Sequence, residues 1–133
     1  ALAFSLLGIG AVYYNMGDYK NAAVHFEKSL NIQKEVGFKM IKLETTTYLY
    51  LSYTHIGKEY HRKNIYSLIK DADNIEFEIN FRLYQLLNEI SYLETAYKQV
   101  QDKASDMKKD IKIRFLSYPI ITAIMEERKK LNN

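Results

Sequence analysis

The side chains best suited to metal binding or acid–base chemistry in this chain are its histidines and its acidic pairs. His25 is expected on a helix beside Phe26, where a surface or packing role is favoured, and His55 and His61 lie on either side of Gly57. A zinc site also needs cysteines or further histidines at ligand spacing. Because the chain has 3 histidines and no cysteine, the sequence predicts no metal site.

The acidic pairs favour a structural role over acid–base catalysis. Paired carboxylates catalyse proton transfer only in a pocket that shifts their pKa values. Here the pairs fall at expected helix starts, where the helix dipole favours negative charge, or on a polar helical tail: Asp71/Asp73, Glu76/Glu78 and Glu126/Glu127. The Gly-X-Gly at 8–10 lies in a helical pattern and follows no strand, so it is not a nucleotide-binding fingerprint. We therefore predict no enzymatic activity and no cofactor.

Basic residues gather near the end of the chain and raise the question of nucleic-acid binding. They alternate with acidic residues at 102, 106 and 110, a spacing that predicts ion pairs along one exposed helix; the basic residues are Lys103, Lys108, Lys109, Lys112 and Arg114. The whole chain has a formal net charge of only +3, less than expected for a nucleic-acid-binding surface. We expect no nucleic-acid partner.

The composition predicts a globular domain of long helices. Of 133 residues, 47% are hydrophobic, one is proline and five are glycine. No apolar run approaches the roughly 20 residues that cross a bilayer, so we expect no membrane partner, and the lack of cysteine suits a cytoplasmic location. The sequence begins at Ala1 within a helical pattern, which leads us to expect a piece of a larger protein.

Two amphipathic helices over 2–16 and 19–36 organise the chain. Their apolar residues recur at helical spacing, and Gly17-Asp18 predicts a tight turn between them. The small residues Gly10 and Ala22 lie where the two helices must approach closely. Gly37 is expected as the left-handed residue that ends the second helix.

This pattern resembles the tetratricopeptide repeat (TPR), a helix–turn–helix unit. The residues that carry the resemblance are Leu6, Ile9, Gly10, Tyr13, Gly17, Tyr19, Ala22 and Phe26. The resemblance implies an all-α solenoid of two to three antiparallel helix pairs with C-terminal capping helices. Its expected divisions within one domain (1–133) are repeat one (1–37), repeat two (38–73), a degenerate repeat three (74–106) and capping helices (107–133).

The second unit matches the first after a shift of 40 residues. Leu49, Tyr53, Ile56 and Gly57 then fall on Ile9, Tyr13, Met16 and Gly17, which predicts helices over 39–56 and 59–71. The small residues are lost, because Tyr50 replaces Gly10 and Arg62 or Lys63 replaces Ala22. A bulky tyrosine at the close-approach position should push the helices apart or change their crossing.

The third unit is fainter. An apolar stripe predicts a helix over 75–89, a joint near 90–92 leads to another helix, and Ser117-Tyr118-Pro119 ends one short helix and starts a final one over 119–131. The spacing over 96–126 resembles the closing segment of TPR arrays in large bacterial signalling proteins.

The resemblance implies a concave wall formed by the first helix of each pair, where an extended peptide or a partner helix would lie. The inward positions are Leu7, Ala11, Tyr14 and Asn15 in repeat one, and Thr47, Leu51, Thr54 and His55 in repeat two. These side chains could instead pack against neighbouring helices. Packing is favoured for Leu7 and Leu51, and both alternatives stay open for Tyr14 and Asn15.

The expected function is therefore that of a non-enzymatic protein- or peptide-binding module, acting as a scaffold or regulatory part of a larger cytoplasmic signalling or transcription-regulating protein. Homo-oligomers are possible in this class. The alternative is the sensor domain of a Rap-like peptide-pheromone receptor, whose 40-residue repeats have ends similar to Lys34-Glu35-Val36-Gly37. Leu7 and Ala11 occupy positions where chaperone carboxylate clamps have lysine and asparagine, which argues against that mode of binding.

Overall fold

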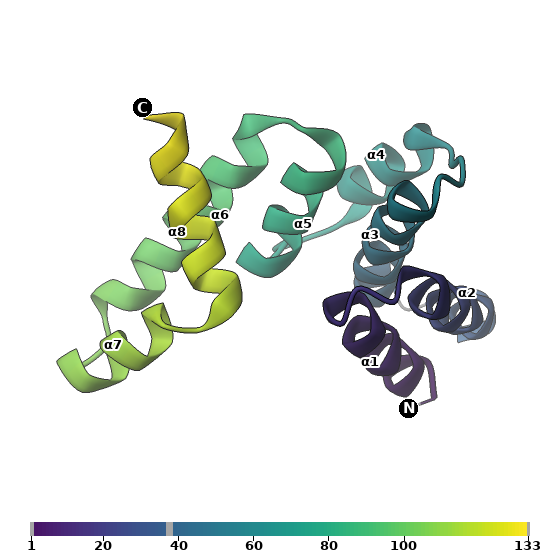
Figure 1. Cartoon of the computed structure of the whole chain (residues 1–133), viewed down its shortest axis with the longest axis horizontal. Helices are drawn as coiled ribbons and strands as arrows, with labels where there is room; N and C mark the ends of the chain where they lie inside the picture. The colour runs from purple at the N-terminus through teal and green to yellow at the C-terminus, as the bar shows by residue number, and fades with distance from the viewer. Residues whose placement is uncertain (1, 37–38, 133) are drawn as a thin grey trace. The chain divides into compact units, whose positions relative to one another are not determined.

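The chain is all-helical over the residues that the structure describes. The computed structural model describes residues 2–36 and 39–132, and within them it has no strand. The helices are α1 (Leu2–Asn15), α2 (Tyr19–Val36), α3 (Lys39–Ile56), α4 (Arg62–Asp71), α5 (Phe77–Leu87), α6 (Ile90–Ser105), α7 (Lys109–Leu116) and α8 (Pro119–Leu131) (Figure 1). They form two compact units, Ala1–Asn74 and Ile75–Asn133, which are described separately below.

Most of the predicted helices occur where the sequence pattern places them. The predictions over 2–16, 19–36, 39–56 and 119–131 agree with α1, α2, α3 and α8 to within a residue. The predicted helix over 59–71 is wrong at its start, because α4 begins at Arg62. The predicted joint at 90–92 is also wrong, because the break lies at Asn88, a left-handed residue with φ 57°. The predicted left-handed end at Gly37 lies outside the described residues.

The turn at Gly17 recurs 40 residues later. Gly17 has φ +82° and the Asp18 amide donates to the Tyr13 carbonyl at 2.9 Å. Gly57 has φ +73°, and the Lys58 amide donates to the Tyr53 carbonyl at 2.9 Å. Glycine suits both positions because a side chain disfavours left-handed backbone. The 40-residue recurrence read from the sequence therefore extends to the backbone geometry of both turns.

The packing of α1 on α2 depends on a glycine. A Cβ atom added to Gly10 would lie 2.5 Å from Cε1 of Phe26, a ring with no exposed surface. Ala22, on α2, is also fully buried. The predicted close approach at Gly10 and Ala22 is therefore present, and Phe26 fills the space that a larger residue at position 10 would need.

A buried polar network joins the first three helices. Ser29 on α2 donates to the Ala3 carbonyl of α1 at 2.7 Å, and the Gln33 side-chain amide donates to both Ser29 Oγ (3.0 Å) and Thr45 Oγ1 of α3 (2.9 Å). All three side chains are buried. Buried polar groups are stable when they are hydrogen-bonded to one another, so this network fixes the register of α1, α2 and α3.

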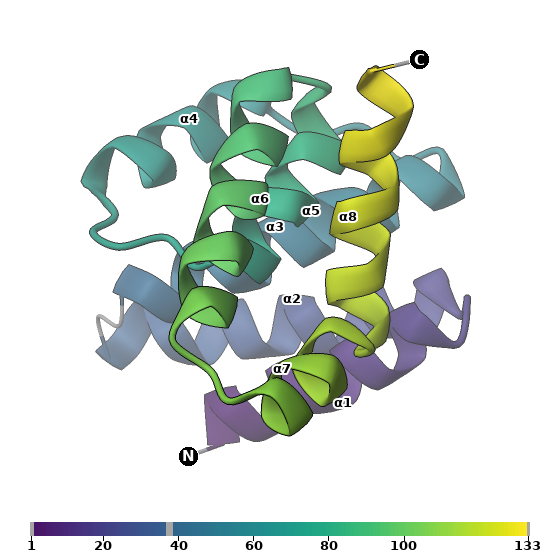
Figure 2. The ribbon, with the colours of Figure 1, turned by 90° about the vertical axis from the view of Figure 1, so that its left-hand side faces the viewer.

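The second unit, Ile75–Asn133, has its own apolar core. α6 and α8 lie side by side with α5 against them (Figure 2), and the core side chains are Phe81, Leu93, Ala96, Val100, Ile121 and Ile124. Arg128 of α8 forms an ion pair with Glu94 of α6 at 2.6 Å. Tyr84 of α5 donates to Glu127 of α8 at 3.2 Å. These contacts hold α8 against α5 and α6.

The basic residues near the end of the chain do not form the predicted ion pairs. The chain turns at residues 106–108 between α6 and α7, so these residues do not share one continuous helix. Lys103 forms an ion pair with Glu76 at 3.9 Å. Within residues 2–36 and 39–132, this is the one ion pair made by the five basic residues Lys103, Lys108, Lys109, Lys112 and Arg114. The prediction of pairing along a single helix is therefore wrong.

Candidate functional site

A cleft of about 680 Å³ opens within the first unit. It lies between α2, α3, the non-helical segment 58–61 and α4. Its lining combines aromatic and aliphatic side chains with amide and charged ones. A concave site with apolar walls and a few polar groups is the usual form of a ligand-binding site.

Three tyrosines form the aromatic wall. The ring of Tyr50 stacks on Tyr60 with centroids 4.5 Å apart, and lies 6.2 Å from the ring of Tyr53. Leu30 and Leu49 line the same cleft. Tyr50 and Tyr53 are 8% and 9% exposed and Tyr60 is half-buried, so Tyr60 offers a ligand side chain most of the accessible ring surface while the stacked Tyr50 supports it.

The cleft arises where the second helix pair departs from the first. Tyr50 stands where the first pair has Gly10, and its ring lies against Tyr60 while its hydroxyl accepts a hydrogen bond from Asn64 at 3.2 Å. On α4, Arg62 and Lys63 are exposed and Ile65 is the fully buried residue. Because α4 begins only at Arg62, residues 58–61 are not helical and line the cleft, Tyr60 among them.

Polar side chains surround the aromatic wall. Asn31 is exposed on α2, and Asn64 on α4 is also exposed beside Tyr50. A side-chain amide both donates and accepts hydrogen bonds, which matches the alternating groups of a peptide backbone. The Lys58 ammonium lies 4.7 Å from the ring centroid of Tyr53. The cleft therefore presents hydrogen-bond donors and acceptors together with positively and negatively charged side chains.

Tyr53 is held in its neutral form. Burial, followed by the negative charge of the neighbouring Glu27 and the hydrogen bond that the phenol donates to it, raises the pKa of Tyr53 to about 12. A phenol that donates to a carboxylate resists ionisation, because the phenolate would face a second negative charge. Tyr53 therefore keeps its proton near neutral pH, donates a hydrogen bond to Glu27 and does not act as a proton-transfer group.

The sequence-predicted concave residues lie in several environments. Ala11 is half-buried, while Asn15, Thr54 and His55 are exposed and Leu7, Tyr14, Thr47 and Leu51 are buried. The Thr47 hydroxyl donates to the Leu43 carbonyl at 2.7 Å, and the Thr54 hydroxyl donates to the Tyr50 carbonyl at 2.9 Å. Both threonines therefore use their hydroxyl hydrogens on their own helix.

Tyr14 and His55, each predicted to lie on the concave wall, come together within an aromatic cluster. Tyr14 is 9% exposed, with ring centroids 5.3 Å from Tyr19, 5.4 Å from Tyr48 and 6.1 Å from His55. His55 stacks on Tyr19 at 3.8 Å. Of the two alternatives that the sequence left open for Tyr14, these contacts favour packing. Asn15 is exposed beside the cluster.

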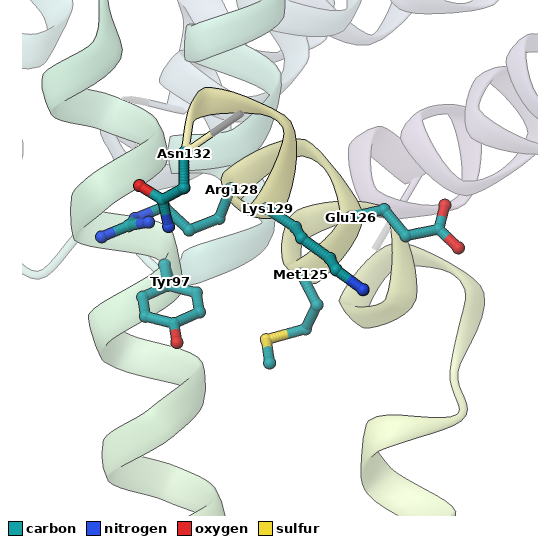
Figure 3. A pocket seen from close by; sticks show the side chains of 6 residues that line it. All are labelled: Tyr97, Met125, Glu126, Arg128, Lys129 and Asn132. Carbon is teal, nitrogen blue, oxygen red and sulfur yellow. The ribbon is translucent and has the colours of Figure 1, made fainter.

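A smaller hollow of about 300 Å³ lies in the second unit. Tyr97 of α6 and Met125 of α8 face it, and Glu126 points away from Tyr97 (Figure 3). The Arg128 guanidinium lies 5.0 Å from the Tyr97 ring centroid and is also paired with Glu94. Because Glu94 already balances the charge of Arg128, this hollow has less to offer a ligand than the cleft.

The described residues hold no group of three or more histidine, cysteine or acidic side chains that could bind a metal ion. Within the same part of the chain, no helix is long and apolar enough to cross a membrane. Comparisons with protein-family models, with curated proteins and with solved structures found no match.

Proposed function

We propose that this chain is a TPR-like peptide-binding module, and that the cleft of the first unit is its binding site. The observation that carries the proposal is the convergence of Tyr50, Tyr53, Tyr60, Asn31 and Asn64 on one cleft of about 680 Å³. Support for the repeat comes from the matched turns at Gly17 and Gly57.

The cleft suits an extended peptide with one apolar or aromatic anchor. The anchor side chain would lie mainly against the half-buried ring of Tyr60, because Tyr50 and Leu49 are buried beside it, and an aromatic contact of this kind contributes strongly to binding. The Asn31 and Asn64 amides would then bond the backbone of the peptide on either side of the anchor. The binding role requires no catalytic group, in keeping with a neutral Tyr53.

The proposed site differs from the concave wall expected from the sequence. Tyr14 is packed among aromatic rings, whereas Tyr60 and the exposed Asn31 and Asn64 line an open cleft. Asn15 is exposed at the end of α1 and does not line the cleft. It therefore offers a matched asparagine through which the two candidate surfaces can be compared.

The test is to select peptides from a random display library on the whole chain and to measure their affinity by calorimetry. We expect Tyr60→Ala to weaken binding at least about tenfold, since a buried aromatic anchor contact contributes about 2 kcal/mol or more. Asn31→Ala should weaken it about 2- to 10-fold through one lost hydrogen bond. Asn15→Ala should have no effect. Loss of binding in Asn15→Ala with full binding in Tyr60→Ala would contradict the proposed site.

A further inference from the structure

The cleft of the first unit contains a carboxylate without a cationic partner. Glu27 of α2 lines the cleft and is half-buried. Its carboxylate accepts a hydrogen bond from the Tyr53 hydroxyl. Within residues 2–36 and 39–132, it forms no ion pair with a lysine, arginine or histidine. A carboxylate that has lost part of its hydration is stabilised by a hydrogen-bonding cation, so Glu27 is suited to pair with a cation that a ligand supplies.

The other charged side chains of the cleft are less buried than Glu27. The basic residues of the lining, Lys42, Lys58 and His61, are all exposed. Glu59, the second carboxylate of the lining, is exposed as well. Exposed charges are screened by water and salt, whereas a partly buried charge is screened much less. The lining contains charges of both signs, but the charge that a bound ligand meets with least screening is therefore that of Glu27.

An ammonium group of the chain itself already lies on this side of the cleft. The Nζ atom of Lys58 is 4.7 Å from the centroid of the Tyr53 ring, a distance at which an aromatic ring attracts a cation. Lys58 follows the turn at Gly57 and is exposed, so a ligand can displace its side chain into water. The contact shows which chemistry this part of the cleft accepts, namely a cation over the ring whose hydroxyl is bonded to Glu27.

We infer that the peptide bound by the cleft carries a lysine or arginine beside its anchor residue, an inference that rests on the proposed peptide-binding role. The cation pairs with Glu27 and lies over the Tyr53 ring in place of the Lys58 ammonium, while the anchor contacts Tyr60. Both rings lie close to Tyr50, with centroids 6.2 Å away for Tyr53 and 4.5 Å away for Tyr60. Successive residues of an extended peptide are about 3.3 Å apart along the chain, and the long side chain of lysine or arginine covers the remaining distance.

The test uses the display-selected peptides whose binding depends on Tyr60, and measures their affinity for the whole chain by calorimetry. Glu27→Gln removes the charge but keeps an oxygen that can accept from Tyr53. It should weaken binding about tenfold through the loss of a charge-assisted hydrogen bond. Replacing the lysine or arginine of the peptide with glutamine should cause a similar loss, and the two changes together should cost little more than either alone. Fully additive losses would show that the two groups do not pair and would overturn the inference.

Two further variants test the position and the sign of the charge. Glu126→Gln, at an exposed position of α8 outside the cleft, is the matched control and should change the affinity less than about twofold. Lys58→Ala should strengthen binding about 2- to 5-fold, because it removes the cation that competes for the Tyr53 ring. Weaker binding by Lys58→Ala would indicate an acidic group on the peptide and contradict the inference, as would equal losses in Glu126→Gln and Glu27→Gln.

The same measurements distinguish a failure of this inference from a failure of the proposed function. If no selected peptide loses affinity for Tyr60→Ala, the cleft is not the binding site and both are wrong. If the selected peptides depend on Tyr60 but carry no lysine or arginine beside the anchor, and bind Glu27→Gln as tightly as the parent chain, the cleft binds peptides and only the cationic requirement is wrong.

Discussion

Replacing Gly10 with alanine tests the packing of α1 on α2. The new Cβ atom would lie 2.5, 2.7 and 3.0 Å from three carbons of the Phe26 ring. The ring has little room to retreat, because Phe26 has no exposed surface and stacks on Tyr48 at 5.6 Å. We therefore expect the methyl group to push α1 away from α2 or to force the ring out of its preferred rotamer.

The magnitude follows from two opposing contributions. Alanine in place of a mid-helix glycine stabilises a helix by about 0.5–1 kcal/mol. Overpacking a close-packed contact costs about 1–3 kcal/mol. The net expectation for Gly10→Ala is a loss of up to about 2.5 kcal/mol in the free energy of unfolding.

Gly8 provides the matched control, because it lies in the same helix and, apart from its chain neighbours and the backbone of its own helix, no atom lies within 4 Å of its added Cβ. Gly8→Ala should raise the free energy of unfolding by about 0.5–1 kcal/mol. Both variants are compared with the parent chain by urea denaturation followed by circular dichroism at one protein concentration. If Gly10→Ala proved as stable as Gly8→Ala, the close contact with Phe26 and the register of α1 on α2 would be refuted.

Two further predictions concern the cleft and the second unit. In the folded chain Tyr53 keeps its proton up to about pH 12, whereas in the unfolded chain its pKa is 10.0; stability therefore falls as pH rises from 10 towards 12. Tyr53→Phe should make that fall shallower in urea titrations at a series of pH values, and an unchanged slope would refute the shift. Ile124→Ala should cost about 2–5 kcal/mol because Ile124 is fully buried. Ile113→Ala, at a position 63% exposed, should change stability by less than about 0.5 kcal/mol, and equal losses in the two would contradict the assigned core.

The helices could be predicted because their local signals agree with one another. Gly17 followed by Asp18 marks a tight turn, and the structure places Gly17 at φ +82° between α1 and α2. Pro119 fits the first turn of a helix, and α8 begins at that residue. The joint after α5 was predicted at the wrong residues. The helix ends at Asn88, which adopts a left-handed backbone. Asparagine can adopt this conformation but does not need it, so its presence in a sequence does not by itself predict a helix end.

The ion pairs of the basic segment were mispredicted for a related reason. Charges three or four residues apart meet only on a continuous helix. The chain turns at residues 106–108, between α6 and α7, so the spacing between Lys103 and Lys109 no longer corresponds to one helical face. Spacing predicts a contact only after the helix boundaries are known.

The cleft could not be read from the repeat pattern, because it lies where the second helix pair departs from that pattern. In the first pair, Gly10 admits the Phe26 ring and the two helices close on each other. In the second pair, the residue corresponding to Gly10 is Tyr50, and Tyr66, which corresponds to Phe26, is 40% exposed. The sequence does indicate this departure, since a tyrosine at a close-approach position predicts separated helices. What fills the separation depends on the late start of α4, which brings Tyr60 against Tyr50 at 4.5 Å. The same substitution that weakens the repeat thus supplies the aromatic wall of the proposed binding site.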